Sequence, residues 1–172
     1  MANDTVLPED RNSVLHIARS TIAALASQLI ARALRMPEPY WATITTIVVM
    51  QSSLGAAWKV SVKRFAGTVL GAIVGGLLAS YFGGNLIAFA VAMVGSGLIC
   101  LGLHLDRTAY RFAGITLAII MLVGRPQSAW IIAAHRFVEV SLGIAVALVI
   151  AAAWPEKQSI PAVPGSATQA PP

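Results

Sequence analysis

Two arginines lie within or at the edge of apolar stretches, where a cation is costly and therefore informative. Arg64 is followed four residues later by Thr68, and Arg136 is followed three residues later by Glu139. On a helix the first spacing places a cation and a hydroxyl on one face, and the second places a cation beside a carboxylate. Ionisable groups in apolar helices mark ligand or ion pathways by default. The pattern therefore predicts a site that recognises an anion.

Each of these residues also has a purely structural interpretation. Arg64 begins its apolar stretch, so its long side chain could simply reach back to the lipid headgroups. Arg136 and Glu139 can form a partly buried ion pair that only pins their helix, because an unpaired carboxylate there would be costly. The sequence leaves both interpretations open.

Small residues recur every four positions after Arg64 and predict a helix-packing surface. They are Gly67, Gly71, Gly75 and Ala79. Small residues at this spacing form a shallow groove that lets a second helix approach closely. We expect packing to be the role of the glycines, on the same helix face as the cation.

An aromatic pair follows a helix-breaking sequence. Tyr40 and Trp41 come directly after Met36-Pro37-Glu38-Pro39, in which two prolines oppose helix continuation. Aromatic residues are enriched where a helix meets the membrane interface. The two rings could also stack on an aromatic ligand.

The composition is that of a membrane protein. Of the 172 residues, 57% are hydrophobic and 11% are charged, and the mean hydropathy is +0.76. The net charge of +5 does not indicate nucleic acid, because the cations lie at the ends of apolar stretches, as topology signals and lipid contacts do. We expect the lipid bilayer as a partner and no nucleic acid. The single Cys100 allows no disulfide within the chain.

The predicted fold is an all-α membrane protein with a six-helix transmembrane bundle in residues 14–155. Residues 1–13 are polar and acidic and are predicted to form a cytoplasmic tail. Residues 156–172 are rich in Pro and Ala, and we expect them to be disordered. The apolar stretches predict helices over residues 14–34, 42–50, 58–82, 86–103, 110–123 and 128–154.

The second helix is too short to cross a bilayer unless it is extended. The hydrocarbon core is about 30 Å thick, which needs about 20 helical residues. The helix crosses only if it continues through Gln51-Ser52-Ser53 towards Gly55. Otherwise it is a half-helix, and broken helices in bundles tend to line sites.

The basic residues favour a cytoplasmic N-terminus. With six spans both termini lie on one side, and eight Lys and Arg residues then fall inside against four outside.

A weak internal repeat accompanies this pattern. Trp58 and Arg64-Phe65 recur as Trp130 and Arg136-Phe137, at an offset of 72 residues. Because the offset equals three spans, the two copies would have opposite orientations, as in the 3+3 inverted repeats of transporters. Chance recurrence of short motifs is the alternative.

The order of four short motifs resembles the transmembrane module of the fusaric acid resistance and aromatic acid exporter family. The motifs are Pro39-Tyr40-Trp41, Gln51-Ser52-Ser53-Leu54-Gly55, Arg64-x-x-Gly67-Thr68-x-x-Gly71 and Arg136-x-x-Glu139-x-x-x-Gly143, the last closing on Trp154-Pro155. The resemblance covers about residues 14–156.

The resemblance implies a protein of the bacterial inner membrane that exports weak aromatic or other organic acids. Because one six-helix unit can hardly enclose a pathway alone, it also implies a homodimer. A periplasmic adaptor protein is a further partner that larger members of the family would suggest.

In such an exporter the residues already named would have specific roles. Arg64, Arg136 and Thr68 would bind the carboxylate, and Tyr40 and Trp41 would contact the aromatic ring. Glu139 would either carry a coupling proton or remain in its ion pair.

A different class of function competes with transport. The chain could be an accessory or scaffold subunit whose cations only set topology and whose glycines pack on a partner. An enzyme is not expected, because the sequence has no nucleophile–base pair, metal-ligand spacing or phosphate-binding loop. We expect no catalytic residue, no metal and no cofactor.

Overall fold

All the regular elements in the described part of the chain are α-helices. The computed structural model describes residues 8–51, 53–123 and 127–154. The helices are α1 (Pro8–Ala33), α2 (Tyr40–Val49), α3 (Leu54–Phe82), α4 (Leu86–Gly102), α5 (Arg107–Leu122) and α6 (Ala129–Ala153). The all-α membrane architecture expected from the sequence is confirmed.

The first helix begins earlier than the apolar pattern predicts. It starts at Pro8, inside the segment 1–13 that we expected to be a tail. Proline suits the first turn of a helix, and the acidic residues that follow it in sequence favour a helix N-terminus. The predicted C-terminal tail, 156–172, lies outside the described residues.

Three helices are long and apolar enough to cross a membrane. They are the segment Ser13–Ala33 of α1, the whole of α3 and the whole of α6. The helix α2 has 10 residues, which at 1.5 Å per residue is about 15 Å, half of a bilayer core.

The break after α2 decides between the two interpretations of the second helix. The helix ends at Val49, Met50 is extended with ψ 111°, and α3 begins at Leu54. The Ser53 hydroxyl accepts a hydrogen bond from the Ala56 amide at 3.2 Å and so caps α3. The helix therefore does not continue towards Gly55, and α2 is a half-helix.

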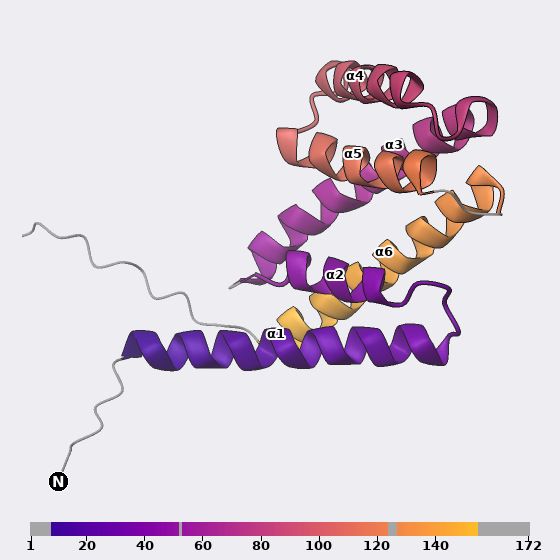
Figure 1. Cartoon of the computed structure of the whole chain (residues 1–172). Coiled ribbons are helices and arrows are strands. Elements are labelled where there is room, and N and C mark those ends of the chain that lie inside the picture. Colours follow the sequence, from indigo (N-terminus) through magenta and orange to yellow (C-terminus); the bar gives the residue numbers. More distant parts are fainter. Residues whose placement is uncertain (1–7, 52, 124–126, 155–172) are drawn as a thin grey trace, which may run out of the picture.

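The helices form three layers. Figure 1 shows α1 and α2 side by side on one side, α4 and α5 on the other, and α3 and α6 running obliquely between them. The most extensive packing is that of α3 on α5, followed by α3 on α6 and α2 on α6.

Glycines let α3 approach the backbone of α5. A Cβ added at Gly67 would lie 2.3 Å from the carbonyl oxygen of Ala109, and one at Gly71 would lie 2.4 Å from that of Ala113. A Cβ at Gly75 would lie 3.2 Å from the side chain of Ile120. The small-residue face is thus the surface on which α5 packs, as the spacing predicted.

The packing of α3 on α5 is repeated by that of α6 on α2. A Cβ at Gly143 would lie 2.4 Å from the carbonyl oxygen of Ala42 and 2.7 Å from Cβ of Thr45. The residue 72 positions earlier, Gly71, faces Ala113 and Thr116 in the same way. Equivalent contacts between equivalent residues support the 3+3 repeat.

The two halves meet at equivalent residues. The rings of Phe65 on α3 and Phe137 on α6 are 5.3 Å apart, at an interplanar angle of 60°. These phenylalanines occupy matching positions in the two repeats. The contact therefore lies near the axis that relates the repeats.

Candidate functional site

A cavity of about 360 Å³ lies between α2, α3 and α5. Two cations and two aromatic rings contribute to its wall, and the rest is mostly aliphatic. The lining residues are Trp41, Ile44, Val48, Arg64, Thr108, Arg111, Phe112 and Ile115.

Arg64 is the buried cation of this cavity. Only 3% of the residue is exposed. Its Nε and Nη2 donate hydrogen bonds to the hydroxyl of Thr45, at 3.2 and 3.0 Å. Its Cζ lies 4.7 Å from the centroid of the Phe112 ring, a cation–π contact.

The charge of Arg64 has no carboxylate to balance it within the described residues. Its partners there are a neutral hydroxyl and an aromatic ring, and its Nη1 donates no hydrogen bond to any described residue. Buried charges in proteins are normally paired. The guanidinium can therefore bind an anion that enters the cavity.

Trp41 supplies an aromatic ring to the wall. Its indole Nε1 is buried and has no hydrogen-bond partner among the described residues. The indole N–H can only donate, and the atom is enclosed by protein, so the ring of Trp41 and not its nitrogen is the surface offered to the cavity. The centroid of the Trp41 ring also lies 3.8 Å from Cζ of Arg136. The side chain of Trp41 thus connects the cavity to the second buried arginine.

Arg136 and Glu139 form a fully buried ion pair outside the cavity lining. Nη1 of Arg136 lies 3.5 Å from Oε2 of Glu139, and each side chain is 1% exposed. The other oxygen of Glu139, Oε1, accepts a hydrogen bond from the backbone amide of Glu38 at 3.1 Å. The ion pair expected from the spacing is present, and it is more deeply buried than expected.

Two residues that were predicted to contact a ligand lie outside the cavity wall. Tyr40 is 47% exposed, and its hydroxyl donates to Oε1 of Glu38 at 2.5 Å. Thr68 is buried one turn after Arg64, on the same face of α3. Neither residue lines the cavity. Of the residues predicted to bind a ligand, the fold brings Arg64 and Trp41 together.

Arg111 and Phe112 are cavity residues that the sequence reasoning did not assign to the site. The exposed Arg111 brings a second cation to the wall, and Phe112 stacks on Arg64. One signal could have identified them, because Arg111-Phe112-Ala113-Gly114 repeats the letters of Arg64 to Gly67.

The exposed charges beside the cavity include a salt bridge. Lys63, next to Arg64, pairs with Asp106, which precedes the first residue of α5. Both side chains are partly or largely exposed, so this pair lies at the surface while Arg64 is buried.

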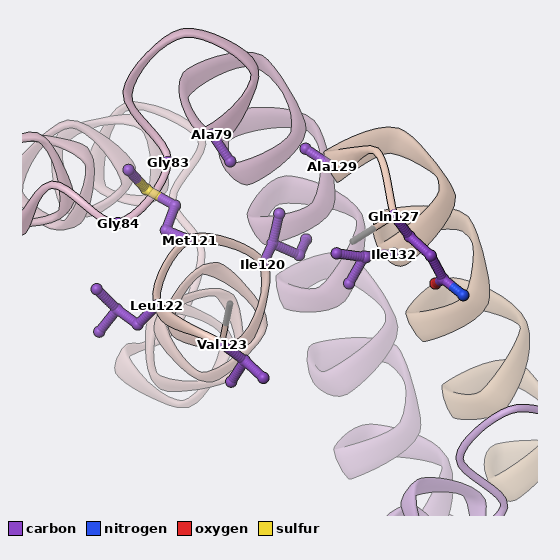
Figure 2. Close-up of a pocket in the computed structure, with 10 residues that line it drawn as sticks. All are labelled: Ala79, Gly83, Gly84, Ile120, Met121, Leu122, Val123, Gln127, Ala129 and Ile132. Atoms are coloured by element: carbon purple, nitrogen blue, oxygen red, sulfur yellow. The ribbon is translucent and has the colours of Figure 1, made fainter. Parts of the chain in front are cut away.

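Two further cavities have uncharged walls. One of about 300 Å³ lies where the ends of α3 and α5 meet the start of α6, and Gln127 is the one polar side chain in its wall (Figure 2). The other, of about 550 Å³, is lined by aliphatic residues, Trp58 and Gly55. Neither offers a counter-charge for an anion.

No side-chain cluster in the described part of the chain resembles a metal site. Groups of three or more His, Cys, Asp or Glu side chains that could hold an ion are absent among those residues. The charged groups of the cavity, Arg64 and Arg111, are both cations, which suit an anion and not a cation.

Residues 23–150 match a family model described as fusaric acid resistance protein-like. The chain belongs to this family. The resemblance carried by the sequence motifs is thereby confirmed, and the matched range includes α2 to α5, the C-terminal part of α1 and most of α6.

Two relatives from Escherichia coli strain K12 are identical to this chain at about a third of the aligned positions. The inner membrane protein YeeA is 32% identical over 154 residues, which cover 86% of this chain and 42% of YeeA. The uncharacterized transporter YdhK is 33% identical over 135 residues, which cover 73% of this chain and 20% of YdhK. The chain thus spans less than half of each relative. No solved structure matches it.

Proposed function

We propose that this protein is an inner-membrane transporter subunit that exports weak organic acids, aromatic carboxylates in particular. The observation that carries the proposal is Arg64, a buried guanidinium that lacks a carboxylate partner among the described residues and lines a cavity with aromatic walls. The guanidinium supplies the charge for a carboxylate, and Trp41 and Phe112 supply surfaces for a flat ring.

The family and the names of the relatives support this class of function. Fusaric acid resistance protein-like is the description of the family, and the relatives are named as an inner membrane protein and a transporter. These names point to transport and not to enzymatic catalysis. They also support an inner-membrane location. Cytoplasmic termini, which the count of basic residues favours only for six full spans, stay part of the proposal.

A homodimer is part of the proposal. Three helices of the described chain are long and apolar enough to span a bilayer. One such bundle has too few helices to surround a pathway. A second copy would complete it. A periplasmic adaptor protein is a further proposed partner, suggested by the family resemblance and not by any surface of this chain.

Glu139 is the proposed site of proton coupling. It is a buried carboxylate paired with Arg136, so gain of a proton would break a charge pair close to the cavity wall at Trp41. Transport driven by a pH gradient would be lost in Glu139→Gln, while exchange of the acid at equal pH would remain.

The test is uptake of labelled benzoate into proteoliposomes that contain only this protein, with and without a pH gradient. We expect uptake by the unaltered protein and a loss of at least tenfold in Arg64→Gln. Lys59→Gln is the matched control, because it removes an exposed cation from the same helix, and it should transport normally.

The outcomes separate transport from the alternative function. Equal uptake by Arg64→Gln and Lys59→Gln would contradict a site at Arg64. No uptake of any acid by folded, dimeric protein would favour an accessory subunit that needs a partner, which co-purification from the native membrane would then reveal.

A further inference from the structure

The cavity is lined by residues that match each other in the two repeats. Trp41 and Phe112 both line it, and so do Ile44 and Ile115. Each pair is separated by 71 residues, the same relation that links Ala42 with Ala113 in the helix packing. Both members of each of these two pairs face one space, so the cavity lies where the two repeats meet.

Two of the buried arginines, Arg64 and Arg136, are also a matching pair with matching ring contacts. Arg64 stacks on Phe112 of α5, and Arg136 stacks on Trp41 of α2. Each guanidinium therefore contacts the ring contributed by the opposite repeat. The arrangement brings two cations close to one cavity.

One repeat provides a carboxylate for its arginine and the other does not. Glu139 pairs with Arg136 at 3.5 Å. The matching position in the first repeat is Gly67. A Cβ there would lie 2.3 Å from the carbonyl oxygen of Ala109, so close packing on α5 excludes any side chain. The absence of a carboxylate beside Arg64 is therefore built into the fold.

We infer that the carboxylate of a ligand neutralises Arg64 as Glu139 neutralises Arg136, and that it reaches Arg64 from the cavity between α2, α3 and α5. The cavity then binds one flat monoanion, held by the guanidinium of Arg64 and packed against the rings of Trp41 and Phe112. The inference rests on the proposed transport of organic acids, and it adds the stoichiometry, the charge of the ligand and a role for Glu139 that does not require a proton.

The electrostatic consequence is that Glu139 limits the affinity of the site. Its negative charge cancels that of Arg136, which leaves Arg64 as the net buried charge at this wall. Neutral Glu139 would let the field of Arg136 reach the cavity. A unit charge acting through an effective dielectric constant of about 20 over roughly 10 Å changes binding by about tenfold.

The experiment is equilibrium binding of labelled benzoate to the purified full chain in detergent. We expect Glu139→Gln to bind about tenfold more tightly than the unaltered protein. The double variant Arg136→Met, Glu139→Gln should bind within about threefold of it, since the pair as a whole is neutral. Arg64→Gln should lose binding.

Two results would overturn the inference. Unchanged or weaker binding by folded Glu139→Gln means that Glu139 does not oppose the ligand. A tenfold loss in the double variant means that Arg136 contacts the ligand directly. The double variant decides the matter if Glu139→Gln does not fold, because removal of both partners of a buried ion pair is often tolerated.

The failure of the inference and the failure of the proposed function are distinguishable. If the unaltered protein binds no aromatic or aliphatic acid, the proposed function fails together with the inference. If the unaltered protein binds benzoate and Arg64→Gln does not, the proposed site stands. The response of Glu139→Gln then tests the inference alone.

Discussion

Substitution of Gly71 by Ala tests whether close approach of α3 and α5 holds the site together. The added Cβ would lie 2.4 Å from the carbonyl oxygen of Ala113, whereas ordinary contact begins at 3.4 Å. The helices must separate by about 1 Å to accept one methyl group. Overpacking of a close-packed interface typically costs about 1–3 kcal/mol, which exceeds the gain of up to about 1 kcal/mol from replacing a helical glycine by alanine.

The same separation would move the cavity wall. Ala113 directly follows Phe112, whose ring stacks on Arg64, so a shift of α5 weakens that contact. We expect Gly71→Ala to lower the unfolding midpoint in detergent, measured by circular dichroism, and to reduce benzoate binding as well.

Gly95→Ala is the matched control. Gly95 lies in the helix α4, and a Cβ there meets nothing within 4 Å. This variant should be as stable as the unaltered protein or slightly more stable. If Gly71→Ala and Gly95→Ala unfold at the same midpoint, the close packing of α3 on α5 does not carry the stability that we assign to it.

Two further predictions concern the buried donors. Trp41→Phe keeps an aromatic wall but removes the buried indole donor, so benzoate should bind within about threefold of the unaltered protein, while the unfolding midpoint falls because a smaller ring fills less space and stacks more weakly on Arg136; tenfold weaker binding would contradict a contact made through the ring alone. Arg19 is buried, and it donates to the carbonyl oxygen of Trp154 at 2.8 Å and to that of Gln51. Arg19→Met leaves these carbonyl groups without that donor and should cost about 3 kcal/mol in unfolding experiments, whereas Arg35→Met, at an exposed position, should cost little.

Features that depend on neighbours along the chain followed from the sequence. Hydropathy identified the membrane class and the positions of the helices, because burial in lipid imposes long apolar segments. The spacing of Arg136 and Glu139 predicted their ion pair, because residues three apart share a helix face. The glycine spacing predicted a packing surface for the same reason.

The ends of helices were less predictable. Ser53 caps α3 at a position where the apolar pattern had not yet begun, so the helix starts at Leu54 and not at Trp58. The first turn, Leu54-Gly55-Ala56-Ala57, is separated from the long apolar stretch by Lys59, Lys63 and Arg64, so hydropathy did not mark where the helix begins. The half-helix α2 was one of two alternatives, and the extended backbone at Met50 selected it.

Which residues line the cavity was decided by the tertiary structure alone. The sequence placed Arg64 and Trp41 in a site, but it could not add Arg111 and Phe112 or exclude Tyr40, because these assignments depend on how α2 and α5 are placed against α3. Periodicity predicts which residues share a helix face, but it does not predict which helix faces pack against each other. Here the glycine contacts of α3 with α5 and of α6 with α2 set that register, and the register decides which arginine faces the cavity.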